Sequence, residues 1–282
     1  MAADSLGPDW ARHGAGWAAN DAVFDRIFAP VTDAILTAAD LTGAVLDIGC
    51  GTGTLLERAS DLGASAVGVD ISADMIDAAA RRVPQANAVV ADAQTADLRA
   101  LAAGEGFDRI VSRFGVMFFP DPVAAFTNIR RSTAPGASMT FMCWQDGHRN
   151  PIFTLGTSTL IKALDQKPAR PEPGSPGPVA FADPDYLRGV LTDAGWSNTR
   201  IDDFSFRADY SSADSDGVEE RLAVILATST GQSVEEAVRA KLGESGWSDL
   251  LDGVRESLRA ERADGILTHE GHCWLVSTRA GT

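Results

Sequence analysis

Residues Val45–Thr54 read VLDIGCGTGT, and this stretch decides the fold. It begins as an apolar run typical of a buried strand, interrupted by Asp47 alone. Three glycines follow at alternate positions, and glycine permits positive φ angles and lets a ligand approach the backbone closely. The residues after them predict a helix over Thr54–Leu62. A buried strand, a glycine-rich turn and a helix in this order are typical of nucleotide-binding α/β proteins.

The alternation of strands and helices continues on the carboxyl side of this stretch. It predicts a mostly parallel, Rossmann-like α/β sheet with helices on both faces. The predicted strands are Ala44–Ile48, Ala66–Val69, Ala88–Ala91, Phe107–Ser112 and Ser138–Trp144, with helices at Thr54–Leu62, Ala73–Arg82, Asp97–Ala102 and Val123–Thr133. After them we expect helices over Ile152–Leu164, Asp183–Ala194 and much of 214–264, and strands over Thr199–Arg207 and His272–Thr278. Before them, Pro30 is expected to end one helix and begin the next.

Asp47, Asp70 and Asp92 stand at the carboxyl ends of three successive predicted strands. Open α/β sheets bind their ligands at this edge. A carboxylate at Asp47 would repel a pyrophosphate but attract a cation. Asp70 can accept hydrogen bonds from both hydroxyls of a ribose, and Asp92 can accept one from the amine of an adenine. The dinucleotide-binding fingerprint requires a glycine where this chain has Thr54, which counts against a pyrophosphate ligand.

The composition narrows the classes of function. The formal net charge of −15 and the sequence pI of about 4.6 disfavour nucleic acid and anionic membranes as partners. Three cysteines without short spacing indicate neither a disulfide framework nor a metal site, so no metal is expected. The chain shows no signal peptide and no run of about 18 apolar residues, which favours the cytoplasm.

These motifs resemble class I S-adenosylmethionine-dependent methyltransferases of the small-molecule type, in the group similar to ubiquinone and menaquinone biosynthesis enzymes. The resemblance is carried by Leu46–Gly53, Gly68–Ser72, Ala91–Ala93, Phe107–Phe119 and Phe126–Trp144. It implies a seven-stranded sheet whose last strand runs antiparallel. One departure stands out, because about fifty residues intervene where the family joins its last two strands by a short hairpin. That departure predicts an extra helical cap.

The resemblance also implies a cofactor, S-adenosylmethionine, and the residues that hold it. The methionine end would be lined by Asp47, Gly49, Gly51 and Thr52. Asp70 would hold the ribose, Asp92 the adenine, and the backbone around Ser112 and Arg113 would face the sulfonium. Ile71 and Met75 can add apolar contact to the adenine ring. The predicted cofactor residues are Trp17, Asp47, Gly49, Cys50, Gly51, Thr52, Asp70, Ile71, Met75, Asp92, Ala93 and Arg113.

Three further features suggest how an acceptor is handled. His148 follows the fifth predicted strand, where an imidazole can remove a proton from a hydroxyl or amine of the acceptor. Trp10 and Trp17 suggest that residues 1–40 form a helical segment covering the cofactor site, ahead of a cofactor-binding core over 41–150. Residues 151–282 then complete the sheet, with a proline-rich lid at 166–180 and a helical insertion at about 212–264.

The sequence leaves three functional hypotheses open. The first is in-line transfer of a methyl group to a partly apolar small-molecule acceptor. The second is an NAD(P)-dependent oxidoreductase on a related fold, against which Asp47 and Thr54 count. The third is a non-catalytic regulatory protein that keeps the cofactor pocket. The acceptor atom and the oligomeric state are not predicted.

Overall fold

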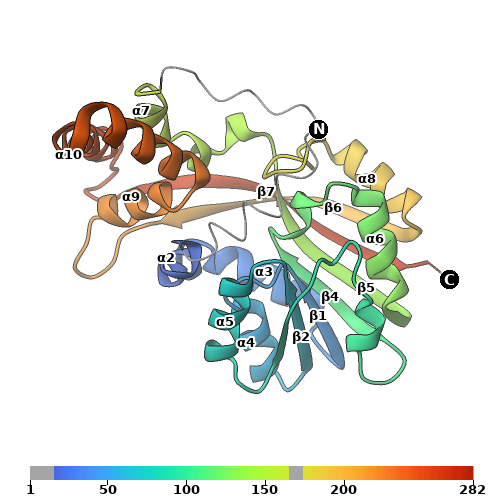
Figure 1. Ribbon diagram of the computed structural model, residues 1–282. Helices are drawn as coiled ribbons and strands as arrows, with labels where there is room; N and C mark the ends of the chain where they lie inside the picture. Colours follow the sequence, from blue (N-terminus) through green and yellow to red (C-terminus); the bar gives the residue numbers. More distant parts are fainter. Residues whose placement is uncertain (1–15, 165–173, 282) are drawn as a thin grey trace.

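The computed structural model describes residues 16–164 and 174–281, in which seven strands form one sheet (Figure 1). The strand order is β3-β2-β1-β4-β5-β7-β6. The strands are β1 (Ala44–Ile48), β2 (Ser65–Asp70), β3 (Asn87–Val90), β4 (Phe107–Arg113), β5 (Thr133–Trp144), β6 (Trp196–Asp209) and β7 (Thr268–Ala280). The first five are parallel, whereas β7 is antiparallel to both of its neighbours. The predicted fold class, including the antiparallel last strand, is confirmed.

Helices cover both faces of the sheet (Figure 1). One face carries α3 (Ala29–Ala39), α4 (Thr54–Asp61) and α5 (Ala73–Arg82), and the other carries α6 (Pro122–Arg131) and α8 (Pro184–Asp193). The central strands are therefore buried on both sides and are apolar along their length, as in Ile110, Val111 and Phe141. Ahead of α3 lies α2 (Asp21–Ile27), and Pro30 occupies the first turn of α3 as expected, since its missing N–H needs no partner there.

Two predicted helices are shorter than expected. Residues 97–102 form only a 3₁₀ turn, Leu98–Leu101, in which the Asp97 side chain accepts from the backbone N–H of Ala100. The span 152–164 is divided into the 3₁₀ turn Pro151–Phe153 and the helix α7 (Thr157–Ile161). Gly156 separates them with a φ of +75°, and a Cβ there would lie 2.7 Å from Ile225 and 2.9 Å from Leu258. The helix therefore begins only after Gly156, which packs tightly against Ile225 and Leu258. The hydrophobic periodicity of the sequence gives no indication of this contact.

The last two strands extend beyond the rest of the sheet and carry a helical cap (Figure 1). We define the helical cap as α7, α9 (Val218–Leu226) and α10 (Ser229–Ala260), in which α10 contacts both other helices. Gly243 interrupts α10 with non-helical φ and ψ angles. The long connection between β6 and β7 is thus helical, as predicted. The proposed lid at 166–180 falls largely outside the described residues, and no helix among the described residues is long and apolar enough to cross a membrane.

Candidate active site

Asp47, at the end of β1, is the most unusual polar side chain at the carboxyl edge of the sheet. It is 1% exposed, and neither carboxylate oxygen has a hydrogen-bond partner. Burial raises the pKa of this carboxyl from 3.8 to about 7, although the nearby Arg113 guanidinium opposes the rise. Buried polar groups in folded proteins are nearly always paired, so an unpaired carboxylate here marks a place for a cationic ligand.

The glycine turn follows Asp47 directly and has the backbone geometry that the sequence predicted. Gly49, Gly51 and Gly53 have φ angles of +64°, +54° and +89°. A Cβ on Gly51 would meet no atom within 4 Å, so the turn presents open backbone at this point. Cys50 lies within the turn against Gly68, where burial raises the pKa of its thiol. A neutral, buried thiol in van der Waals contact fills space and is a poor nucleophile.

Asp70, at the end of β2, is held by the turn itself. One carboxylate oxygen accepts from the backbone N–H of Gly51 at 3.0 Å and the other from that of Ser72 at 2.9 Å. Burial raises the pKa of Asp70, and these two hydrogen bonds act in the opposite direction. Each oxygen keeps a second lone pair, so the carboxylate is fixed in place and can still accept from two ligand hydroxyls.

The residues predicted to contact an adenine differ in exposure. Met75 is buried and Ile71 is 42% exposed, beside Ser72, whose side chain caps α5. Asp92 is exposed after β3, and its oxygens accept from the backbone N–H of Gln94 and the hydroxyl of Thr95. Its observed role is to close this turn, next to the buried Ala93. Contact between this group and an adenine stays a prediction.

Arg113, at the end of β4, takes part in an ionic network that sequence reasoning missed. Its guanidinium donates to the hydroxyls of Thr32 at 2.9 Å and Thr54 at 3.1 Å, and lies 3.5 Å from an oxygen of Asp25. Asp25 also accepts from Thr54 at 2.6 Å and from Arg82 at 2.5 Å. The network joins α2, α3, α4, α5 and β4 around the glycine turn, and Arg113 is therefore paired within the protein.

Aromatic side chains that follow β4 and β5 pack against residues of α2, α3 and β6. Phe114, directly after Arg113, has a φ of +68° and stacks on Trp144 with ring centroids 4.5 Å apart. A positive φ is rare for an aromatic residue and tends to occur at functional sites. We define the aromatic cluster by its edge-on and tilted contacts as Phe28, Phe114, Trp144, Phe153 and Phe206. Phe28, Trp144 and Phe206 are at most 6% exposed, so most of this cluster belongs to the hydrophobic core.

The remaining predicted residues are Trp17 and His148. Trp17 stacks on Phe24 of α2 with ring centroids 4.2 Å apart, whereas Trp10 lies outside the described residues. His148 is exposed in the 3₁₀ turn that follows β5, at the same edge of the sheet as Asp47. Its backbone N–H is held by Asp146. The structure therefore places His148 on the predicted edge, in contact with solvent.

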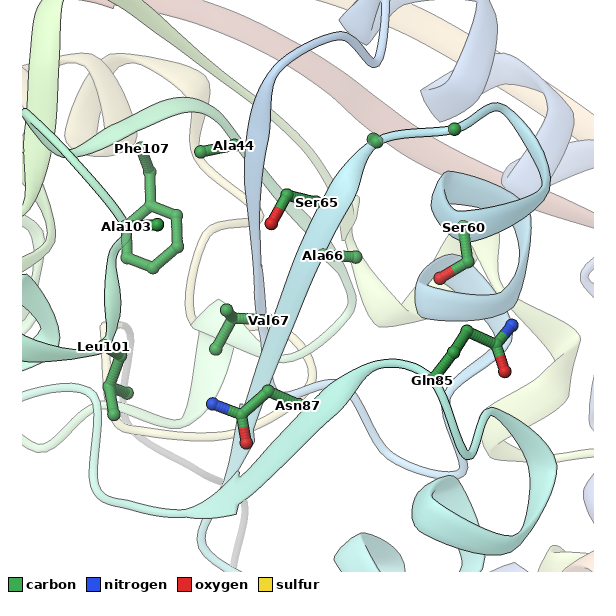
Figure 2. A pocket seen from close by; sticks show the side chains of 12 residues that line it. Ala44, Ser60, Ser65, Ala66, Val67, Gln85, Asn87, Leu101, Ala103 and Phe107 are labelled. Carbon is green, nitrogen blue, oxygen red and sulfur yellow. The ribbon is translucent and has the colours of Figure 1, made fainter.

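A hollow of about 380 Å³ lies at the opposite, amino edge of the sheet (Figure 2). Its lining includes Ser65, Val67 and Asn87 near the starts of β2 and β3, and Phe107 at the start of β4. The glycine turn and the aspartates lie at the other ends of the same strands. This hollow is consequently separate from the candidate active site.

Comparison with known proteins agrees with this geometry. Residues 45–136 match the family model described as a methyltransferase domain. The chain is 29% identical to the demethylmenaquinone methyltransferase of Renibacterium salmoninarum, over 55% of this chain and 66% of that protein. It is 30% identical to the ubiquinone biosynthesis O-methyltransferase of Dinoroseobacter shibae, over 54% of this chain and 58% of that protein. The chain thus spans between half and two thirds of the length of such relatives.

Solved structures share the fold at lower identity. A methyltransferase-like protein of Bacillus halodurans superposes with a TM-score of 0.54 at 16% identity, covering 89% of this chain and 99% of that chain. The phosphoethanolamine N-methyltransferase 2 of Haemonchus contortus, solved with S-adenosyl-L-methionine, has a TM-score of 0.52 at 18% identity, covering 93% and 57%. At these identities the likeness concerns the fold alone.

Proposed function

We propose that this chain, whose residues 45–136 match a methyltransferase domain, is a class I enzyme that transfers a methyl group from S-adenosylmethionine to a small-molecule acceptor. The observation that carries the proposal is Asp47, whose buried carboxylate has no partner beside an open glycine turn. S-adenosylmethionine bears a sulfonium and an ammonium group and no phosphate. A cation of this kind satisfies the carboxylate that the fold leaves unpaired.

Each part of the cofactor has a matching group among the predicted residues. We assign the methionine end to Asp47 and the turn Gly49–Thr52, and the sulfonium side to the backbone at Arg113. The ribose is assigned to Asp70, because its carboxylate is oriented by two backbone N–H groups and keeps free lone pairs. The adenine is assigned to the residues around α5 and the end of β3, which are Ile71, Met75, Asp92 and Ala93.

The chemistry then requires little from the protein beyond positioning. When bound, the sulfonium supplies an activated methyl group and leaves as a neutral thioether. The chain holds the acceptor in line with that methyl group and excludes water. In well-oriented intramolecular reactions such positioning lowers the barrier by about 7–11 kcal/mol. His148 is the proposed general base for an acceptor that carries a proton on its attacking atom.

The residues around the core complete the proposal. We propose that the segment up to residue 40, with Trp17 and Phe24 stacked near the start of α2, covers the cofactor. Residues 41–150 hold the cofactor, and the helical cap shapes the acceptor pocket. A cytoplasmic enzyme fits the three free thiols of Cys50, Cys143 and Cys273.

Calorimetry with S-adenosylhomocysteine and, in parallel, NAD tests this function. We expect the first to bind and the second not to bind. Asp70→Ala should weaken S-adenosylhomocysteine at least tenfold, because both ribose hydroxyls lose their acceptor. The control Asp77→Ala changes an exposed carboxylate on α5 and should leave affinity unchanged. Binding of NAD alone would favour the oxidoreductase hypothesis, and cofactor binding without turnover across an acceptor panel would favour the regulatory one.

A further inference from the structure

Phe114, directly after β4, is held in a backbone conformation that its side chain does not favour. In the described part of the chain, four non-glycine residues have positive φ angles. Three of them, Asp40, Asn198 and Asp264, have short polar side chains that tolerate this conformation. The fourth is Phe114, and for an aromatic side chain a φ of +68° is strained. Residues strained in this way cluster at binding and catalytic sites.

The positive φ determines on which face of the sheet the Phe114 ring lies. The backbone N–H of Phe114 donates to the carbonyl of Met142, so the pairing of β4 with β5 continues up to this residue. Successive side chains of a regular strand lie on opposite faces. Here, however, the Phe114 ring and the preceding Arg113 guanidinium both lie beside Phe28, at 5.1 Å between ring centroids and 5.9 Å from Cζ to centroid. The strained backbone therefore brings the ring to the face on which Arg113 lies.

The position of Phe114 along the edge places it between the two partners of the proposed reaction. In the sheet, β4 lies between β1, which leads into the glycine turn, and β5, which leads to the turn that carries His148. On the β1 side, Gly115 packs against Gly49 of the glycine turn. On the β5 side, the Phe114 ring stacks on Trp144, the last residue of that strand.

Phe114 can also be reached by a bound molecule, unlike the rings that pack on it. Phe28 and Trp144 are 6% and 4% exposed and belong to the hydrophobic core. Phe114 is partly exposed, as are Gly49 and Gly51 of the glycine turn. Phe114 thus belongs to the accessible part of the edge to which the cofactor is assigned.

The charge on the sulfur atom distinguishes the two forms of the cofactor. S-adenosylmethionine carries a positively charged sulfonium, whereas the sulfur of S-adenosylhomocysteine is a neutral thioether. The ammonium group is common to both. An aromatic ring attracts a cation that lies within about 6 Å of its centre, and a neutral thioether lacks this electrostatic attraction.

We propose that the Phe114 ring lies against the sulfonium of bound S-adenosylmethionine and recognises its charge, so that Phe114 distinguishes the methyl donor from the product. This inference rests on the proposed function and deepens it by assigning a residue to the charged sulfur. When the methyl group passes to the acceptor, the electron pair of the broken S–C bond stays on sulfur and the charge is lost. The attraction to the ring is lost with it, which favours release of the product.

Calorimetry on the full chain, with each of the two cofactor forms and without an acceptor, tests this assignment. The quantity compared is the ratio of the two dissociation constants. Phe114→Leu removes the aromatic ring but keeps an apolar side chain. We expect it to weaken S-adenosylmethionine about five- to tenfold and to change the affinity for S-adenosylhomocysteine less than twofold. A loss of general packing would weaken both ligands alike and would leave the ratio unchanged.

Three further variants make the comparison specific to the ring. Phe114→Tyr keeps an aromatic face and should retain the wild-type ratio. Phe153→Leu removes another partly exposed ring of the aromatic cluster, one that is not assigned to the sulfonium, and should also retain it. Phe114→Gly removes the ring and adopts a positive φ without strain, so it provides the same test if the leucine variant does not fold. We expect it to shift the ratio as Phe114→Leu does.

The two levels of the proposal fail separately. If the wild-type protein binds neither cofactor form, the proposed function is wrong. If it binds both, while Phe114→Leu and Phe114→Gly leave the ratio of dissociation constants unchanged, only the assignment of Phe114 is wrong. An equal shift of the ratio in Phe153→Leu would also contradict the assignment, because the effect would then not depend on the ring beside the glycine turn.

Discussion

Gly49 and Gly115 pack backbone against backbone, so that a Cβ added to Gly49 would lie 2.8 Å from the Cα of Gly115. This contact joins the turn after β1 to the turn after β4. In addition, the N–H of Gly115 donates to the hydroxyl of Ser112, which itself donates to the carbonyl of Ile48. The two turns that form the carboxyl edge are thus locked together, and a side chain at either glycine has no room.

Gly115→Ala should therefore destabilise the protein without touching a predicted ligand contact. The new Cβ would lie 2.5 Å from the carbonyl oxygen of Ile48, and such overpacking costs about 1–3 kcal/mol. Urea denaturation measures the free energy of unfolding. Gly253→Ala in α10 is the control, because a Cβ there meets nothing within 4 Å, and alanine is favoured in helices. Equal effects of the two substitutions would contradict the close packing.

Asp47→Asn should stabilise the ligand-free protein at pH 8. The folded-state pKa of Asp47, about 7, is above the ordinary value of 3.8, so ionisation opposes folding and the wild type loses stability as pH rises from 4 to 7. A rise of about three units corresponds to at most about 4 kcal/mol, which the asparagine variant does not lose. Melting curves at pH 4 and pH 8 check this. The advantage of the variant should be largest at pH 8 and small at pH 4.

The same carboxyl should make cofactor binding dependent on pH. The ammonium group that S-adenosylhomocysteine shares with S-adenosylmethionine is attracted only by the ionised form, so the wild-type affinity for S-adenosylhomocysteine should rise as pH increases from 6 to 8. Asp47→Asn should bind at least tenfold more weakly at pH 8 and lose most of this pH dependence. Calorimetry at three pH values is sufficient. A variant that keeps the wild-type affinity at pH 8 would remove Asp47 from the site.

Asp25→Ala should destabilise the protein by about 2–3 kcal/mol, because the partly buried Arg113 and Arg82 lose a shared carboxylate. Asp33→Ala is the matched control, since its contact with Arg58 is 3.8 Å long between exposed side chains and should contribute less than about 0.5 kcal/mol. Chemical denaturation distinguishes the two. Similar losses for both aspartates would mean that the network contributes no more than a surface ion pair.

The three cysteines should be unreactive toward a thiol reagent in the native state. Cys50, Cys143 and Cys273 are buried, and burial raises the pKa of each thiol, whereas the thiolate is the reactive form. We expect no fast labelling with Ellman's reagent at pH 8 and release of colour only upon unfolding. Rapid labelling of Cys50 in the native protein, identified by mass spectrometry, would contradict this and would show that the glycine turn opens.

The parts of the site that could be predicted from sequence are those that are local in the chain. Asp47 and the three glycines lie within one turn, and Asp70 follows the next strand, so strand order alone brings them together. The network of Asp25, Arg82 and Arg113 could not be predicted in this way, because its members lie 57 and 88 residues apart in the chain. Only the packing of α2 onto the glycine turn brings these charges into contact.

The cap illustrates the same limit. The helical pattern of residues 214–264 predicted helices correctly, but gave no indication that Arg221 is buried or what it faces. An arginine on an amphipathic helix is ordinarily exposed. Its burial depends on carbonyls of Ile152 and Leu155, in a segment whose own helix prediction was too long.

The residue pairs between β6 and β7 are continuous from Arg200 with Ser277 to Asp209 with Thr268. The whole segment 210–267 is inserted after this last pair. Insertions or deletions within this segment should not shift the register of β6 against β7, because the pairs of these strands are fixed by their own ladder and lie outside the segment. Changes within this segment are thereby uncoupled from the carboxyl edge that carries Asp47 and Asp70. One contiguous block of sequence, residues 210–267, can be exchanged while the strand pairs that support that edge keep their register.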